Sequence, residues 1–396
     1  MMQISPETQL FIREHSSDDV RVLALQAKKY PDIDMPTAIT QIAGRKVAAE
    51  KIPSWWEIEK IWYPKHLSLE QCSSEITARY KARLLQGDSL TDLTGGFGID
   101  CSFLATGFKS ATYVERQEEL CEIAAHNFPV LNLNHINIKN EDGVTYLQVM
   151  SPVDCLFLDP ARRNEHGGKT VAISDCEPNV AELEELLLQK ANRVMIKLSP
   201  MLDLSLALKE LKQTQEVHIL SVNNECKELL ILLGQTSPAE ISIHCVNLFT
   251  KGTQKEQHFV FTREQEQCSE CTYTDSLETY LYEPNASLLK AGAFRSIAAA
   301  CPVRKLHPNS HLYTSDTFIE NFPGRIFRIV NQCSFNKKEV KENLADLKKA
   351  NVTVRNFPAT VAELRKRIHL AEGGDTYLFA STLNNGQKVL IRCEKV

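Results

Sequence analysis

The sequence has no long hydrophobic segment. Apolar runs such as Leu229–Leu233 are far shorter than the roughly 18 residues that a membrane-spanning helix needs. The first residues show no basic segment followed by an apolar core, so no signal peptide is expected. The 12 cysteines are scattered over 396 residues, too sparsely for a secreted disulfide scaffold. Together these features predict a cytoplasmic protein with reduced cysteines and no association with membranes.

Neither sign of charge is in large excess. Lys and Arg total 45 and Asp and Glu total 50, which gives a net charge of −5. A chain that is basic throughout is therefore excluded, and any nucleic-acid surface must be a local patch. With 43% hydrophobic and 24% charged residues, the composition also excludes wholesale disorder and a fibrous repeat.

Four regions separate by pattern. Residues 1–86 have helical spacing of apolar residues, with helices expected at Asp18–Tyr30, Met35–Lys51 and Leu69–Leu85. Residues 87–270 alternate short apolar runs with helical stretches, which is typical of an α/β domain with a parallel sheet. The six runs are Leu90–Leu93, Ala111–Val114, His135–Ile138, Val153–Leu158, Arg193–Leu198 and Val217–Val222.

The end of this α/β region differs from its beginning. Val217–Val222 is followed at once by Glu228–Leu233, too soon for a parallel crossover, so the pair is predicted to form an antiparallel hairpin. The sheet should then contain six parallel strands and one antiparallel strand. Two further runs, Ile241–Phe249 and His258–Thr262, are expected to extend the sheet edge or to form a hairpin.

The chain beyond residue 270 is predicted to form smaller modules. Residues 271–320 are predicted to be a linker or a small ferredoxin-like module, and residues 321–396 a small α+β domain. Basic residues exceed acidic ones by about seven between positions 321 and 370, which favours an RNA-backbone surface over a merely solvated helix face. The basic residues are Arg325, Arg328, Lys337, Lys338, Lys341, Lys348, Lys349, Arg355, Arg365, Lys366 and Arg367.

The most informative segment is DLTGGFGID, at positions 92–100. It follows a predicted strand and opens a predicted helix. Gly95, Gly96 and Gly98 permit a tight turn and let backbone N–H groups approach a ligand closely. The next strand ends in Glu115-Arg116, and an acid at that point is placed to accept hydrogen bonds from ribose hydroxyls. These features predict a nucleotide-like cofactor, either NAD or S-adenosylmethionine (SAM).

Three features favour SAM over NAD. Cys101 stands where the dinucleotide fingerprint requires its third glycine. Asp142, after the third strand, is placed to hold an adenine amino group. The fourth strand ends in the segment Asp159-Pro160-Ala161-Arg162, which sets a fixed acceptor and a rigid turn at the point where a substrate docks.

These segments resemble the class I SAM-dependent methyltransferases over roughly residues 69–235. The fold class that this implies is a seven-stranded Rossmann-like α/β sheet. The Asp159–Arg162 segment is similar to the Asp-Pro-Pro-aromatic motif of enzymes that methylate exocyclic amines of bases, although Ala161 and Arg162 replace the second proline and the aromatic residue. The predicted cofactor-binding residues are Asp92, Thr94, Gly95, Gly96, Gly98, Glu115, Arg116 and Asp142.

A narrower resemblance covers nearly the whole chain. The string QCSSEITARYK at positions 71–81, the string DPARR at 159–163 and the string IKLSP at 196–200 are similar to a bacterial group of methyltransferase-like proteins with a C-terminal THUMP-like domain. THUMP domains bind RNA in modification enzymes, so the resemblance implies an RNA partner, tRNA or rRNA. The predicted catalytic residues are Asp159, Pro160, Arg162 and Lys197, the last being a charge within the apolar run of the fifth strand.

Three alternatives stay open at this point. The first is a methyltransferase of a small molecule or a protein, the second an NAD-dependent oxidoreductase, and the third a catalytically silent RNA-binding protein. No metal is predicted, because Cys268 and Cys271 lack a second pair of ligands at a suitable spacing. The aromatic cluster of Trp55, Trp56 and Trp62 with Tyr63 suits helix packing better than base stacking.

Overall fold

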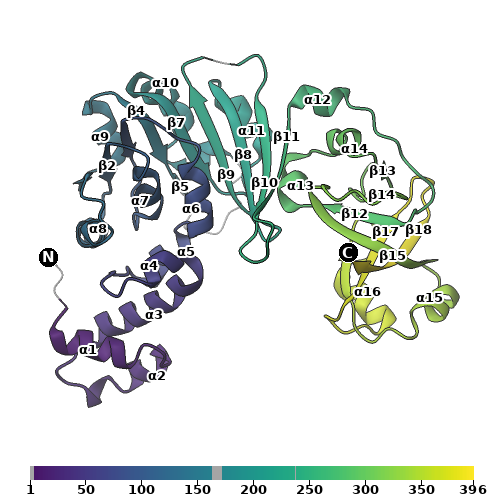
Figure 1. Ribbon diagram of the computed structural model, residues 1–396, viewed down its shortest axis with the longest axis horizontal. Coiled ribbons are helices and arrows are strands. Elements are labelled where there is room, and N and C mark those ends of the chain that lie inside the picture. The colour runs from purple at the N-terminus through teal and green to yellow at the C-terminus, as the bar shows by residue number, and fades with distance from the viewer. Residues whose placement is uncertain (1–3, 163–171, 237) are drawn as a thin grey trace. The chain divides into compact units, whose positions relative to one another are not determined.

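The computed structural model describes residues 4–162, 172–236 and 238–396 (Figure 1). The chain forms two compact units. Unit 1 contains Met1–Gln215 and Leu229–Pro238, and unit 2 contains Glu216–Glu228 and Ala239–Val396. Arg163, within the similarity string at 159–163, lies outside the described residues.

Unit 1 begins with a set of helices. They are α1 (Pro6–Glu14), α2 (Val20–Leu25), α3 (Met35–Lys51), α4 (Pro53–Trp56), α5 (His66–Gln71) and α6 (Glu75–Ala82). The helix predicted at Met35–Lys51 is confirmed, with Asp34 as its N-cap. The helix expected at Asp18–Tyr30 is shorter, because it ends at Leu25 and continues only as a 3₁₀ turn at Ala27–Lys29.

The prediction of one helix over Leu69–Leu85 was wrong. The chain instead forms α5 and α6, which are separated at Cys72–Ser74. Ser74 is the N-cap of α6 with extended backbone angles, and serine at this position favours a helix start over a helix interior. The break leaves Ser73 buried between the two helices, at 4% exposure, where its hydroxyl takes part in the site described below.

The rest of unit 1 alternates strands and helices. The strands are β1 (Ser89–Asp92), β2 (Ser110–Val114), β3 (Ile136–Lys139), β4 (Val153–Leu158), β7 (Ala191–Leu198) and the unit 1 part of β9 (Glu225–Gly234). The helices are α7 (Ile99–Ala105), α8 (Glu118–Val130), α9 (Gly143–Val149), α10 (Val180–Lys190) and α11 (Leu204–Glu210). The short strands β5 (Ala161–Arg162) and β6 (Cys176–Glu177) pair with each other.

The strand order in unit 1 is β9-β7-β4-β1-β2-β3. All pairs are parallel except β7 with β9, which is antiparallel. Strand β9 follows β8 (Thr214–Val222) through Asn223 and Asn224, which both have positive φ, as in the two-residue turns typical of hairpins. The predicted parallel sheet with one antiparallel strand in a hairpin is therefore confirmed.

A shared core joins the N-terminal helices to this α/β layer. Trp55 and Tyr63 are both 2% exposed and pack with Phe97, Ile99 and side chains of α8. The ring of Trp55 meets that of Phe97 edge-on at 5.2 Å. Trp62 stacks on His126 at 3.7 Å. These contacts support the packing interpretation of the aromatic cluster, although Trp56 is 41% exposed.

Unit 2 contains β8, β10 (Ser242–Leu248) and β11 (Glu256–Phe261), and also a separate seven-stranded sheet. Strand β10 pairs in parallel with β8, and β11 pairs with β10 in antiparallel fashion, so both expected strands extend the sheet edge. The second sheet has the order β13-β14-β12-β15-β18-β17-β16.

The remaining elements of unit 2 surround this second sheet. Its strands are β12 (Tyr280–Pro284), β13 (Arg304–Lys305), β14 (Tyr313–Ser315), β15 (Gly324–Ser334), β16 (Asn351–Val354), β17 (Thr376–Thr382) and β18 (Lys388–Lys395). The helices of the unit are α12 (Arg263–Cys268), α13 (Ala286–Ala291), α14 (Ser296–Ala300), α15 (Lys337–Leu344) and α16 (Val361–Ile368). None of the helices in the described part of the chain is long and apolar enough to cross a bilayer.

Candidate cofactor and catalytic site

A cavity of about 590 Å³ opens in unit 1 at the carboxyl ends of the parallel strands. This is the edge at which ligands bind in open α/β sheets, and the volume suits a small-molecule ligand. Its polar wall includes Thr94, Glu115, Asp142 and Asp159. Its apolar wall is made by Leu93, Val144, Leu147, Leu158 and Leu183. A lining that combines polar and aliphatic groups suits a nucleoside, whose sugar is polar and whose base has apolar faces.

Glu115 connects the glycine loop to the second strand. One carboxylate oxygen accepts a hydrogen bond from the Gly96 N–H at 2.9 Å, and the other accepts one from the Gln117 N–H at 2.8 Å. The side chain is nearly buried, at 8% exposure, yet it lines the cavity. Because each carboxylate oxygen has a second lone pair, Glu115 keeps acceptor capacity for ligand hydroxyl groups.

The glycines of the loop serve two different purposes. Gly96 and Gly98 have positive φ, at 54° and 86°, which glycine adopts without strain. Gly95 is instead required by packing, because a Cβ at this position would lie 2.2 Å from the ring of Tyr113. The three glycines shape the turn and do not themselves line the cavity, whereas Thr94 does.

Asp92 lies beneath the loop with one carboxylate oxygen unused. Its Oδ1 accepts from the Thr94 N–H at 2.9 Å, while its Oδ2 is buried with no hydrogen-bond partner. Burial raises the pKa of Asp92 to about 8, and the nearby carboxylates of Asp100 and Asp159 add to the shift. A cationic ligand group at this position would favour the ionised form of Asp92 and would supply the donor that its buried oxygen lacks.

Asp159 lines the cavity and pairs with Lys197, which lies beneath it. The Lys197 ammonium is 2.6 Å from Asp159 Oδ2 and 3.2 Å from Asp100 Oδ2. The Asp159 N–H donates to Thr94 Oγ1 at 2.6 Å, which ties the end of β4 to the glycine loop. Burial raises the pKa of Asp159 although Lys197 opposes the shift, and 39% of the side-chain surface stays open. The Asp159 carboxylate meets both solvent and the Lys197 ammonium, and both favour its ionised form.

Three residues outside the predicted set of site residues complete this cluster. The fully buried Lys81 contacts Asp100 Oδ1 at 2.9 Å and donates to Ser73 Oγ at 2.8 Å. Ser73 in turn donates to Asp100 Oδ2 at 2.7 Å. Burial alone would raise the pKa of Asp100, but Lys197 and Lys81 outweigh it and hold the pKa well below its ordinary value. The contacts connect α6, α7 and β7. In the sequence, the one indication of this cluster was the lysine of the QCSSEITARYK string.

The remaining predicted residues occupy less central positions. Asp142 lines the cavity, but its Oδ1 caps helix α9 by accepting from the N–H groups of Val144 and Thr145. Arg116 also lines the cavity and lies 3.6 Å from Glu177, in an exposed ion pair. Pro160 is buried and is not among the residues that line the cavity, and the backbone of Arg162 pairs with that of Cys176.

The described residues therefore unite Thr94, Glu115, Arg116, Asp142 and Asp159 around one cavity, with Asp92 and Lys197 directly beneath it. The cavity thus offers carboxylate acceptors beside aliphatic side chains, and a buried Asp92 oxygen without a hydrogen-bond partner lies next to it.

Comparison with known proteins identifies solved structures that are similar to this chain. A crystal structure from Porphyromonas gingivalis W83, provisionally named a methyltransferase, is 34% identical over 100% of both chains, with a TM-score of 0.88. The modification subunit of a provisionally assigned type I restriction enzyme from Vibrio vulnificus YJ016 is 12% identical, covers 51% of this chain and 56% of its own, and has a TM-score of 0.35. A provisionally named Streptococcus mutans methyltransferase in complex with SAH is 14% identical, with coverage of 40% and 96% and a TM-score of 0.30.

Two family matches cover the C-terminal part. Residues 280–323 match a ferredoxin-like domain family, and residues 324–395 match a THUMP domain-like family. None of the curated proteins matches the sequence. Because identity to the Porphyromonas gingivalis protein extends over the whole of both chains, this chain belongs to the same family, the class I methyltransferase-fold proteins with a C-terminal THUMP-like domain.

Proposed function

We propose that this protein is a SAM-dependent methyltransferase that acts on a base of structured RNA, tRNA or rRNA, at an exocyclic amine. The observation that carries the proposal is the cavity at the strand ends, which is lined by Glu115 and by Asp159, the partner of Lys197. SAM supplies an activated methyl group when bound, so the protein's task is to align a nucleophile and to exclude water.

The residues of the site divide this task. Glu115 would bind the ribose, Asp142 the adenine side, and Asp92 the positively charged amino group of the cofactor. Asp159 would accept an N–H hydrogen bond from the target amine, which raises the electron density on nitrogen and orients its lone pair. Lys197 would be a positioning residue, because it fixes Asp159 through a contact of 2.6 Å.

The RNA part of the proposal depends on unit 2. The match to a THUMP domain-like family covers residues 324–395, and the exposed lysines of this region include Lys337, Lys338 and Lys341 on α15 and Lys348 and Lys349 after it. Lysine ammonium groups neutralise RNA phosphates and release counterions, so binding should weaken steeply with added salt. A target base within a paired segment would need to be extruded, at about a few kcal/mol.

Two measurements test the proposal. Calorimetry should show SAM binding to the purified protein and no comparable binding of NAD. Nucleoside mass spectrometry of total RNA should show one methylated nucleoside that disappears on deletion of the gene. It should return with the wild-type gene and with the control Glu119→Gln, but not with Asp159→Ala. Unchanged RNA together with SAM binding would refute the RNA substrate, and the absence of SAM binding would refute the enzyme.

A further inference from the structure

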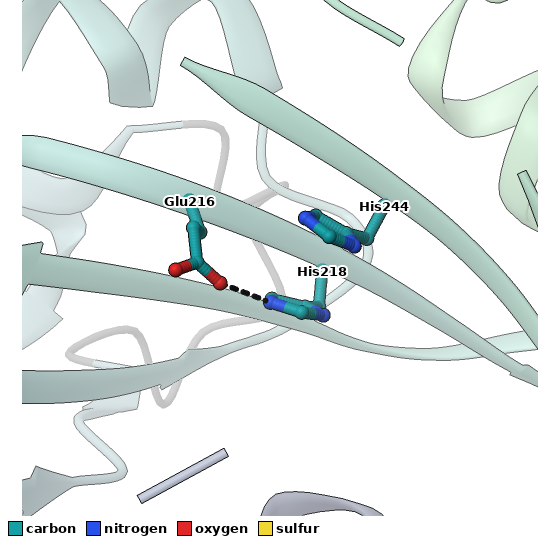
Figure 2. Close-up of side chains that lie close together, drawn as sticks. All are labelled: Glu216, His218 and His244. Carbon is teal, nitrogen blue, oxygen red and sulfur yellow. Dashed lines mark hydrogen bonds and ion pairs between the residues drawn. The ribbon is translucent and has the colours of Figure 1, made fainter. Parts of the chain in front are cut away.

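A group of nitrogen and oxygen ligands lies in unit 2, apart from the residues of the cofactor cavity. Glu216 and His218 on β8 and His244 on β10 present one ligand atom each, and these atoms all lie within 4.8 Å of one another (Figure 2). In the part of the chain that the structure describes, no other set of three potential ligands meets the same distance criterion.

The strand register brings these residues together. His244 is the direct neighbour of His218 in the parallel pair β8–β10. Glu216 precedes His218 by two positions, and residues two apart in a strand project from the same face of the sheet. Figure 2 shows the Glu216 carboxylate and the two imidazole rings on that common face. The grouping is therefore fixed by the backbone of the sheet and not by mobile loops.

A fourth side chain supports the group from strand β11. His258 Nε2 lies 3.1 Å from His244 Nδ1, so one ring donates a hydrogen bond to the other. Stacking links the three imidazoles, with ring centroids 4.2 Å apart for His218 and His244 and 5.2 Å apart for His244 and His258. A hydrogen bond to one ring nitrogen orients the other toward a metal, which is the usual arrangement around metal-binding histidines.

The electrostatic setting suits a cation. His218 is 2% exposed, and its Nε2 lies 3.2 Å from the carboxylate of Glu216. His244 lies between the rings of His218 and His258, and the nitrogen of a neutral imidazole carries the lone pair that binds a metal. Two imidazoles and one carboxylate are the protein ligands of known zinc sites in which a water molecule completes the tetrahedron.

We propose that Glu216, His218 and His244 bind one Zn²⁺ ion, with His258 orienting His244. Ligand atoms around tetrahedral zinc are about 3.3 Å apart, since zinc–ligand bonds are about 2.0 Å long. The three ligand atoms lie within 4.8 Å of one another, so zinc binding requires side-chain rotations that bring them to this spacing. The ion links β8 to β10 and stabilises the sheet edge in unit 2. This site is independent of the proposed methyl transfer.

The test uses the full-length protein without a histidine tag, stripped with a chelator and titrated with Zn²⁺. The wild type should bind one equivalent, and His244→Phe, which keeps a stacked ring but has no nitrogen, should bind at least 100-fold more weakly. Glu216→Gln should weaken binding to a smaller extent. His369→Asn removes an exposed histidine at a left-handed position that asparagine tolerates, and it should bind as the wild type does.

A second variant separates this site from the cysteine pair. Cys268→Ser with Cys271→Ser should leave zinc binding unchanged, and the Co²⁺-loaded protein should show visible absorption without a thiolate charge-transfer band. Equal zinc affinity in His244→Phe and wild type, loss of zinc in the cysteine variant, or no binding at all would each overturn the proposal. Calorimetry with SAM should be unaffected by His244→Phe, so failure here is distinguishable from failure of the proposed enzyme.

Discussion

The charged cluster beneath the cavity makes a quantitative prediction for Lys197→Met. The substitution keeps the length of the side chain but removes an ammonium that lies 2.6 Å from Asp159, 3.2 Å from Asp100 and 3.1 Å from Ser73 Oγ. Breaking a buried ion pair on one side costs about 3–5 kcal/mol, because the remaining charge is left uncompensated. Solvent reaches 39% of the Asp159 side chain, and Lys81 still pairs with Asp100, so we expect about 3 kcal/mol.

Thermal unfolding followed by circular dichroism measures this loss. For 396 residues that unfold together, about 3 kcal/mol corresponds to a fall in Tm of roughly 4 °C, because the unfolding entropy scales with chain length. Lys109→Met is the matched control, because Lys109 pairs with Asp88 at an exposed position and its loss should leave the Tm close to that of the wild type. The deficit of Lys197→Met should shrink from pH 8 to pH 5, because protonation neutralises the carboxylate that lost its partner.

A double variant tests the cause of this loss. Lys197→Met combined with Asp159→Asn removes both members of the pair, so its destabilisation should be smaller than the sum of the two single effects. Equal losses in Lys197→Met and Lys109→Met would refute the reasoning, and so would strict additivity in the double variant. Either result would mean that the contact of 2.6 Å contributes no more than an exposed ion pair.

Three further predictions concern Asp92, Glu115 and the lysines of α15. Asp92→Asn should be more stable than the wild type, and the difference should grow from pH 5 to pH 8 by at most about 1.4 kcal/mol per pH unit. The pKa of Asp92 is raised to about 8 in the folded protein, whereas the same carboxyl ionises at lower pH in the unfolded chain, so the wild type loses stability as the pH rises. Glu115→Gln should weaken SAM binding by roughly 10- to 100-fold in calorimetry, since it removes a charged acceptor but retains one for the Gly96 N–H. Lys337→Ala with Lys338→Ala should reduce the salt dependence of RNA binding, with a change in slope of about 1.5–2 if both contact phosphates.

Each of these predictions has a control of the same residue type. Asp88→Asn, at an exposed position, should show no stabilisation that grows with pH. Glu119→Gln lies on helix α8 outside the cavity lining and should bind SAM as the wild type does. Lys251→Ala with Lys255→Ala changes two exposed lysines outside the THUMP-like match and should keep the salt slope of the wild type. A control that responds as its partner does would refute the corresponding assignment.

The sequence predicted the sheet well because the signals for strands are local. The run Val153–Leu158 coincides with β4, and the hairpin followed from the short distance between two apolar runs. The cavity wall was predictable for the same reason, since parallel strands end at one edge and bring Glu115 and Asp159 together. Such inferences need only the order of the strands and not the packing of side chains.

The contacts beneath the cavity were not predictable in this way. Lys81, Asp100 and Lys197 come from α6, α7 and β7, and their meeting depends on how these elements pack. The zinc ligands present a similar case, because His218 and His244 are 26 positions apart and become neighbours only through the register of β8 and β10. A pattern such as Glu-x-His in a strand places two groups on one face but does not identify the third.

The basic segment shows how packing changes an inference from charge alone. Arg325 and Arg355 both pair with Glu283, which is 1% exposed, and Arg328 pairs with Glu394. Arg367 lies over the ring of Phe335, at 4.2 Å. These arginines therefore make contacts within unit 2 that stabilise its fold. Contact with RNA phosphates would depend mainly on the exposed lysines, so the salt slope should be smaller than the excess of about seven basic residues suggests.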